Sequence, residues 1–314
     1  MKKVVVTGGS GLLGTWVLKE FVSHGYQVLN ADVKNPEENI CDTVIVDLTD
    51  LGEVYGALQG ADAVVHLAAI PVAYSHPNEV TFRNNTLATY NVLEAAAGLG
   101  IKNAVLASSE SSYGICFAKE RFDPQYVPID EAHPQLPEDS YGLSKIVNEE
   151  TAKMMHRRTG MQVVSFRLGN VIVPPMYQNF PSFIHDASQR DRILWSYIDT
   201  RDAAAACRLA VEKQGLGAVE LNLAGDDTSM DIPSRDLMKA EFPNVPIKEN
   251  LGEFESLLNS DKAKELLGWK PVHFWRDNVK LSETHISRCI ITNQAVDKVA
   301  IRRLFFLISS EIVV

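Results

Sequence analysis

Short apolar runs alternate with longer segments of helical periodicity through the first half of the chain. The β-branched runs predict strands at residues 3–7, 26–32, 43–47, 61–66, 103–107 and 162–166. Apolar residues at helical spacing predict intervening helices at 12–23, 51–58, 86–99 and 139–158. Strands that alternate with helices favour a parallel sheet with helices on both faces and right-handed crossovers. The pattern therefore predicts an α/β fold with a doubly wound parallel sheet.

The alternation weakens after Arg167. A helix at 201–212 and a strand at 219–223 return to the main sheet, whereas prolines interrupt the segments on either side of them. We expect residues 1–172 and about 194–225 to form the main domain. Residues 173–193 and 226–280 should form a small substrate-binding lobe over the carboxyl ends of the strands.

The segment 281–314 has a different character, with three arginines followed by the apolar run Leu304-Phe305-Phe306-Leu307-Ile308. It could close the fold as an amphipathic helix and strand, or form an oligomer contact. It could equally be a poorly ordered tail, or sequence foreign to the parent gene. The apolar run is too short to span a bilayer. We treat this segment as a tail of uncertain order.

Composition narrows the class of protein. The chain has 314 residues, 46% of them hydrophobic, and a net charge of −10, which argues against a nucleic-acid-binding surface. No apolar stretch predicts a membrane helix. The four cysteines are widely spaced and the histidines show no ligand spacing, so we expect no disulfide framework and no metal site. Free thiols favour a cytoplasmic location.

A glycine-rich loop, Thr7-Gly8-Gly9-Ser10-Gly11-Leu12-Leu13-Gly14, joins the first strand to the first helix. In that context Gly8 permits a tight turn, Gly11 lets backbone approach a pyrophosphate, and Gly14 lets the helix pack on the strand. The helix N-terminus offers unpaired N–H groups to phosphates. The alternative is a glycine-rich turn of another α/β protein. The loop predicts dinucleotide contacts from Gly8, Ser10, Gly11, Leu12, Leu13 and Gly14.

An acidic residue supports this interpretation. Asp32 ends the second strand, where a carboxylate meets the adenosine ribose hydroxyls and favours NAD over NADP. Lys34 nearby keeps NADP as an alternative. Asp47 and Leu48 end the third strand, where the carboxylate can accept a hydrogen bond from adenine. A helix N-cap explains Asp47 nearly as well.

Further cofactor contacts are expected after the fourth strand. His66, interpreted as a strand-end histidine, precedes small residues that let backbone line the cofactor. Asn85 opens the next predicted helix, either as a cofactor contact or as a cap. The cofactor residues predicted here are Leu67, Ala68, Ala69 and Asn85.

A tyrosine and a lysine carry the predicted chemistry. Tyr141 and Lys145 are four positions apart, which places both side chains on one helix face. The lysine cation is expected to lower the phenol pKa toward working pH, producing a general acid/base for an alcohol. Ala107, a further predicted cofactor contact, ends the fifth strand, and Ser109 follows it, where a hydroxyl would lie near the nicotinamide.

Together these motifs resemble the extended short-chain dehydrogenase/reductase family, also called the NAD-dependent epimerase/dehydratase family, over about residues 1–277. The closing segments 167–171, 257–264 and 267–271 share the likeness. The resemblance implies a Rossmann-type fold and a homodimer formed through the helices 86–99 and 139–158. It implies that Tyr141 is the acid/base, that Lys145 orients the nicotinamide ribose and that Ser109 holds the substrate oxygen, with Ser108 as a near alternative.

Three departures bear on the reaction. Dehydratases of the family carry two adjacent acids where this chain has Glu110-Ser111, so dehydration is disfavoured. Glu110 is either a substrate contact or a solvated loop charge. Val171 and Asp199 are only 28 positions apart, which suits a small substrate. Trp195 stands where nucleotide-sugar epimerases have an arginine. Arg192, three residues earlier, could take over the role of that arginine.

The third departure concerns uronate dehydrogenases of the same superfamily, whose compact layout is similar. They place a carboxylate-binding arginine nine residues beyond the position of Asn170, where this chain has Asn179. An amide lacks the bidentate fork that suits a carboxylate, so uronate specificity is disfavoured. The predicted substrate contacts are Ser111, Asn170, Asn179 and Trp195, although core packing or loop hydrogen bonds explain each of them as well.

We therefore expect an NAD-dependent oxidoreductase that acts on a secondary hydroxyl of a sugar or sugar nucleotide, and we favour net dehydrogenation of a small substrate. The alternative is a UDP-hexose 4-epimerase. A catalytically silent NAD-binding sensor is disfavoured because Tyr141 and Lys145 are both present.

Overall fold

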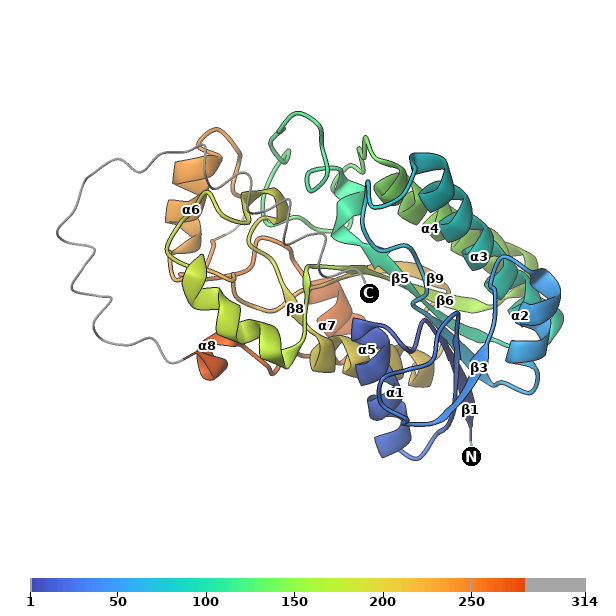
Figure 1. Cartoon of the computed structure of the whole chain (residues 1–314). Helices are drawn as coiled ribbons and strands as arrows, with labels where there is room; N and C mark the ends of the chain where they lie inside the picture. The colour runs from blue at the N-terminus through green and yellow to red at the C-terminus, as the bar shows by residue number, and fades with distance from the viewer. Residues whose placement is uncertain (1, 249, 280–314) are drawn as a thin grey trace. The chain divides into compact units, whose positions relative to one another are not determined.

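The computed structural model describes residues 2–248 and 250–279. These residues belong to one compact unit. The alternatives given above for the segment 281–314 lie outside the described residues. The helices on either side of the sheet and the smaller elements at one end of this unit can be followed in Figure 1.

The core of the unit is a seven-stranded parallel sheet with strand order β3-β2-β1-β4-β5-β6-β9. Its strands are β1 (Lys3–Thr7), β2 (Gln27–Asp32), β3 (Asp42–Ile45), β4 (Ala63–His66), β5 (Asn103–Ser109), β6 (Gln162–Leu168) and β9 (Ala218–Leu223). The order runs outward from β1 in both directions, which confirms the predicted doubly wound α/β fold. Ligands of such sheets bind at the carboxyl ends of the strands, beside the point where the order reverses.

Two apolar layers cover the sheet because successive strand residues point to opposite faces. Val4 and Val6 pack with α1 (Leu12–Ser23) and α5 (Thr200–Glu212). The intervening Val5 packs on the other face, with the helices α2 (Leu51–Leu58), α3 (Asn78–Gly98) and α4 (Ser140–Thr159). Figure 1 shows α1 and α5 on the side of the sheet opposite α3 and α4.

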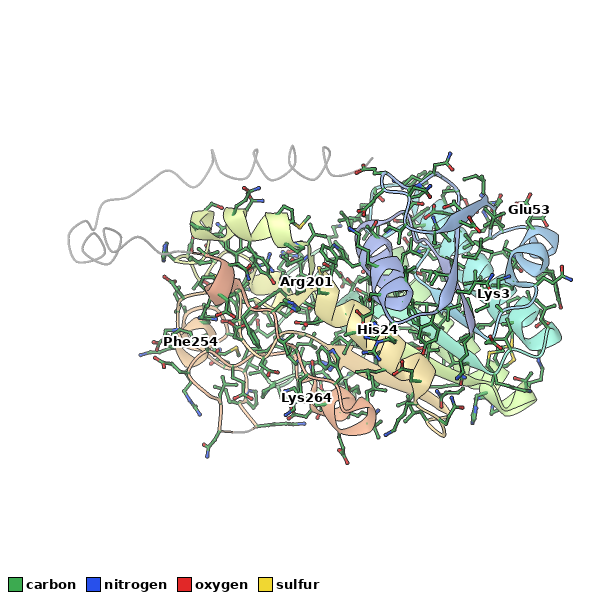
Figure 2. All side chains as sticks on the ribbon, turned by 90° about the horizontal axis from the view of Figure 1, so that it is seen from below. Lys3, His24, Glu53, Arg201, Phe254 and Lys264 are labelled. Carbon is green, nitrogen blue, oxygen red and sulfur yellow. The ribbon has the colours of Figure 1, made fainter. Side chains whose placement is uncertain are left out.

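Smaller elements fill the region that the sequence assigns to a lobe. They are β7 (Val171–Ile172), which pairs with β8 (Ile198–Asp199), the 3-10 turns η2 (Pro174–Ser182) and η3 (Asp191–Ile193), and the helices α6 (Ser234–Glu241), α7 (Asp261–Leu267) and α8 (Trp275–Asn278). Trp195 and Phe242 pack in one apolar cluster of this region, and Tyr177 and Trp275 in another. Figure 2 shows Phe254 at the end of the unit opposite Lys3 and Glu53.

The division into domain and lobe stays a prediction, and one element lies across it. Ala263 and Leu267 of α7, with Trp269 after it, pack in the cluster of α1 and α5. This part of the predicted lobe is therefore anchored to the main sheet.

Two boundaries differ from the prediction in ways that matter for the site. Helix α3 begins at Asn78, eight residues before the predicted start. The prediction missed this first half because it has no apolar stripe: its buried positions, Thr81 and Asn85, are polar. Strand β5 continues two residues further than expected and includes Ser108 and Ser109. A 3-10 turn, η1 (Glu110–Tyr113), follows at once.

A buried ion pair joins α4 to β6. Arg167 donates from Nε to Oε1 of Glu149 (3.0 Å) and from Nη2 to Oε2 (2.8 Å), and both side chains are almost fully buried. Ser108 donates its hydroxyl to the same carboxylate (2.6 Å), and Arg167 also donates to the Tyr113 hydroxyl (3.1 Å). The pair therefore fixes α4 against the end of the sheet where the predicted catalytic residues lie.

Replacing Glu149 by alanine should lower the free energy of unfolding by about 3–5 kcal/mol, because Arg167 would stay buried without its partner. The neighbouring Glu150 is exposed, and among the described residues its one ion pair is with Lys153, so Glu150→Ala should cost no more than about 1 kcal/mol. Denaturant unfolding of the two variants measures both values. Equal losses would contradict this account of the pair.

Candidate active site

The glycine loop is packed so tightly that two of its positions accept only glycine. Gly8 has a φ of +74°, and a Cβ there would lie 2.6 Å from the backbone nitrogen of Ala68. A Cβ on Gly14 would lie 2.1 Å from the carbonyl oxygen of Gly8. The loop is thus held between the end of β4 and the start of α1, as the roles expected for Gly8 and Gly14 require.

The residues around this loop fit a dinucleotide. Gly11 precedes α1 and provides no side-chain cap, so the N–H groups of the first turn are available to an anion. Asp32 accepts hydrogen bonds from the backbone N–H of Ser10 (2.9 Å) and of Lys34 (3.3 Å). Its carboxylate is therefore fixed beside the loop, where a ribose would lie.

The second predicted carboxylate has a different local role from the one weighed above. Asp47 accepts from the hydroxyl (2.7 Å) and the backbone N–H (2.8 Å) of Thr49, and these bonds lower its pKa. The N-cap of α2 is Asp50, which accepts from the N–H groups of Gly52 and Glu53. The interpretation of Asp47 as a helix cap is therefore wrong, while its exposed side chain stays a candidate adenine contact.

His66 and Asn85 lie beside the segments predicted to contact the cofactor. His66 is buried between the hydroxyls of Thr7 (2.6 Å) and Thr89 (3.0 Å), and burial, assisted by the charge of Lys145, lowers its pKa to about 3. A neutral strand-end histidine fits this position. Asn85 lies inside α3, so its expected place at a helix start is wrong. Its amide exchanges two hydrogen bonds with the backbone of Ile70, which holds the segment after Ala69.

Helix α4 brings the predicted tyrosine and lysine to the end of β5. Asp139 caps the helix by accepting from the N–H of Gly142 (2.7 Å), which places Tyr141 in the first turn. Lys145 donates from Nζ to the carbonyl of Ala107 (2.7 Å), and Nζ lies 5.2 Å from the centre of the Tyr141 ring. Both side chains are buried.

The two candidate serines point in opposite directions, as neighbours in a strand do. Ser108 donates to Glu149 in the core beneath α4. Ser109 lies on the side of the phenol, where its hydroxyl opposes the rise that burial causes in the tyrosine pKa. It also donates to the Ser111 hydroxyl (3.1 Å). This placement supports Ser109 as the hydroxyl that works with Tyr141.

The protonation of the pair differs from the expectation for the residues alone. Burial raises the pKa of Tyr141 to about 12, and the hydrogen bond between Tyr141 and Ser109 opposes that rise. Burial also lowers the pKa of Lys145 to about 8, against the attraction of Glu149. The expected lowering of the phenol pKa by the lysine charge is therefore wrong for this structure, since desolvation is the largest influence on both groups and the pKa of Tyr141 is raised. The raised pKa favours the neutral phenol, which can donate a proton to a substrate oxygen.

Two loops meet above the phenol. The Phe117 ring packs edge-on against Tyr141, with ring centres 6.1 Å apart. Tyr74 donates its hydroxyl to the Phe117 carbonyl (3.3 Å), although its own ring is mostly exposed and its φ is +64°. These contacts cover one side of the catalytic ring.

The predicted substrate residues are not equally well placed. Ser111 is buried beside Ser109, and Asn170 is half-buried after β6. Asn179 is exposed on η2. Trp195 is fully buried, donates its indole N–H to the carbonyl of Ala187 (3.0 Å) and packs against Phe242. Its burial contradicts the expected substrate contact and leaves Trp195 a packing role.

Glu110 and Arg192 are charged residues whose roles the sequence did not decide, and the structure places them close to each other. Glu110 is half-buried and accepts from the Ser196 hydroxyl (2.7 Å), which contradicts a solvated loop charge. With Cys116 and Arg192 it lines a small cavity. Arg192 donates to the carbonyl of Ala118 (2.6 Å). Arg190, which no sequence pattern singled out, lies close enough to lower the Glu110 pKa.

The described part of the chain contains neither a metal-binding cluster nor a membrane-spanning helix. Residues 2–248 and 250–279 contain no group of three or more histidine, cysteine or acidic side chains able to hold a metal ion. Within the same ranges no helix is long and apolar enough to cross a membrane. Three cysteines there, Cys41, Cys116 and Cys207, carry free thiols.

Comparison with known proteins places this site in a family. A profile described as "NAD dependent epimerase/dehydratase family" matches residues 4–224, which include the glycine loop, Ser109 and the Tyr141/Lys145 helix. The chain belongs to the NAD-dependent epimerase/dehydratase family. A nicotinamide dinucleotide is accordingly the cofactor that the glycine loop fits.

Individual relatives of the family differ in their activities. A putative UDP-glucose 4-epimerase of Methanocaldococcus jannaschii is 29% identical over 308 residues, covering 88% of this chain and 96% of that protein. A uronate dehydrogenase of Pseudomonas putida is 31% identical over 181 residues, covering 55% and 62%. A short-chain dehydrogenase/reductase superfamily protein from Agrobacterium tumefaciens with bound NAD has the same fold, with a TM-score of 0.69, 20% identity and coverage of 88% and 94%.

The buried carboxyl of Glu110 predicts a pH-dependent stability. Burial raises its pKa from 4.5 to about 8, against the hydrogen bond from Ser196 and the charge of Arg190. The folded state therefore holds this proton more tightly than the unfolded state, and the contribution to stability falls as pH rises from about 4.5 to 8. Glu110→Gln should flatten that decline in melting temperature, whereas Glu120→Gln on the exposed surface should not. Parallel pH curves for wild type and Glu110→Gln would contradict the raised pKa.

Proposed function

We propose that this protein transfers hydride between NAD and a secondary carbinol of a sugar or sugar derivative. The observation that carries the proposal is the placement of Tyr141 between the Ser109 hydroxyl and the Lys145 ammonium at the end of β5. A buried phenol with a hydroxyl beside it suits proton exchange with an alcohol. The names of the relatives, UDP-glucose 4-epimerase and uronate dehydrogenase, support a sugar as the substrate class.

Each residue has a distinct part in the proposed step. Ser109 donates a hydrogen bond that holds the substrate oxygen, and Tyr141 takes the hydroxyl proton on oxidation or returns it on reduction. Lys145 keeps a positive charge beside the phenol, which favours its anionic form during proton removal. NAD supplies the hydride acceptor. Burial of all three side chains excludes water from the transfer.

The cofactor preference rests on Asp32. Its carboxylate lies at the end of β2 and is held by two backbone N–H groups, so it is available to ribose hydroxyls. The negative charge would repel the 2′-phosphate of NADP. The side chain of Lys34 is exposed, and only its backbone contacts Asp32. We therefore propose NAD as the preferred form.

The direction of the net reaction has two candidates. The compact segment between β7 and β8, which holds only η2 and η3, supports net dehydrogenation of a small substrate. The match to a putative UDP-glucose 4-epimerase along 88% of the chain favours the second candidate, a UDP-hexose 4-epimerase that returns the hydride to the other face. A silent NAD-binding sensor would not require the buried Tyr141/Lys145 pair.

Assembly and location are further proposals. Leu87 and Tyr90 on α3 and Leu143 on α4 are exposed apolar side chains on two helices that pack together. Their exposure supports a homodimer formed through these helices. A cytoplasmic location stays a prediction based on the widely spaced cysteines.

A substrate screen separates the candidate reactions. Purified protein is incubated with NAD⁺ and either free sugars or UDP-glucose, while NADH absorbance and sugar-nucleotide isomerisation are recorded together. Sustained NADH formation with a free sugar supports the dehydrogenase. Formation of UDP-galactose without net NADH supports the epimerase instead.

Tyr141→Phe should reduce kcat on the best substrate by roughly 100- to 10,000-fold, because the acid/base is lost while the ring still fills its site. NAD binding, followed by fluorescence titration, should be retained. Tyr90→Phe, on the outer face of α3, is the matched control and should keep full activity. Unchanged turnover in Tyr141→Phe would refute the assignment.

A further inference from the structure

Arg190 is a half-buried cation held by contacts from three distant parts of the chain. It donates from Nε to the Ser229 hydroxyl (2.9 Å), and from Nη2 to Oδ1 of Asn170 (3.0 Å) and to the carbonyl of Ser196 (3.0 Å). Its guanidinium also lies 5.0 Å from the centre of the Phe183 ring. Such a set of contacts fixes the guanidinium in one orientation.

The backbone around Arg190 is strained. Arg190, Leu194 and Trp195 have φ values of +63°, +49° and +53°, in the left-handed region that L residues rarely adopt. Strain of this kind persists only where surrounding contacts determine the conformation, and it concentrates at functional sites. The short turn η3 lies between two of these residues, so the strained segment delivers Arg190 to its partners.

The contact with Asn170 determines how its amide points. A guanidinium has no acceptor, so the amide oxygen must face Arg190 and the NH₂ group must point elsewhere. The Asn170 backbone is fixed too, because its carbonyl accepts from the N–H of Ile198 (2.9 Å). Its Nδ2 has no hydrogen-bond partner among the described residues, and the side chain is partly exposed.

Ser196 connects this arrangement to the catalytic side of the site. Its carbonyl accepts from Arg190, and its hydroxyl donates to Glu110, the residue that follows Ser109. The strands β5 and β6 that precede Glu110 and Asn170 are paired neighbours in the sheet. The contacts of Arg190 thus span from the end of β6 to the catalytic end of β5.

We propose that Arg190 is a positioning residue for substrate recognition, which orients Asn170 so that its NH₂ group donates to an acceptor oxygen of the substrate. The inference rests on the proposed function, since it concerns the grip on a sugar held at Ser109 and Tyr141. The partner is an acceptor oxygen that cannot itself donate, such as a carbonyl or anionic oxygen, because an amide NH₂ can only donate and Asn170→Asp replaces it by an acceptor. Arg190 itself stays behind Asn170 and acts through it.

The sharpest test is Asn170→Asp, which keeps an oxygen facing Arg190 and replaces the NH₂ group by a second oxygen. KM for the sugar should rise by roughly 10- to 100-fold, since a donor is lost and an acceptor would face the substrate oxygen. KM for NAD and the melting temperature should not worsen, because the aspartate still accepts from Arg190. Asn244→Asp, on the exposed surface after α6, is the matched control.

Arg190→Lys tests the positioning step itself. A lysine keeps the charge but cannot hold Asn170, Ser196 and Ser229 together, so KM for the sugar should rise while KM for NAD does not. In the Asn170→Asp background the same change should add little, because the oriented NH₂ group is already absent. Additive effects, or an unchanged sugar KM in Asn170→Asp, would overturn the proposal.

Failure of the proposed function gives a different result. If wild-type protein turns over neither free sugars nor UDP-sugars, the function is refuted, and the inference is judged on Asn170 directly. In ¹⁵N-labelled protein, Arg190→Lys should then shift the side-chain amide resonances of Asn170, while Asn244 resonances stay in place. Unshifted Asn170 resonances would show that Arg190 does not orient the amide.

Discussion

The hydrogen bond from Lys145 to the carbonyl of Ala107 is the contact on which the site depends. A buried ammonium is costly unless it is paired, so helix α4 can pack on the sheet only where this donor finds the end of β5. With that register fixed, Tyr141, one turn earlier on the same helix face, must lie beside Ser109. The Asp139 cap fixes the same helix at its N-terminus, since it sets where the first turn begins.

Burial gives the site its geometry and also sets its electrostatics. Burial holds Tyr141 and Lys145 in place and also removes them from water. The loss of water raises the pKa of the phenol to about 12 and lowers that of the ammonium to about 8. Both groups are thereby biased toward their neutral forms. In the proposed reaction, proton removal from an alcohol works against this bias, so the hydrogen bond between Ser109 and Tyr141 bears directly on the rate.

The parts of this structure that follow a local pattern could be predicted from the sequence. The helices α1 and α2 and the strand β1 have the predicted bounds, because their apolar periodicity is complete within the element. The first half of α3 could not be predicted, since its buried positions Thr81 and Asn85 are polar. Because the true start of α3 was missed, Asn85 was expected at the start of a helix.

The candidate site shows the same limit. The glycine loop and the Tyr141/Lys145 spacing are local signals, and the structure brings both to the carboxyl ends of the strands. The division of roles between Ser108 and Ser109 needed the register of β5. The sequence could not identify Arg190 as a site residue, because only the fold brings together its partners Asn170, Ser196 and Ser229.

The central claim is that hydride leaves the carbinol carbon while Tyr141 takes the hydroxyl proton. A sugar substrate carrying deuterium at the reacting carbon, incubated with the protein and NAD⁺, tests this claim most directly. The account predicts a primary isotope effect, with deuterium recovered in the reduced cofactor, or at the inverted carbon if the reaction is an epimerisation. Deuterium lost to water would contradict it, because that outcome requires removal of the carbon-bound hydrogen as a proton.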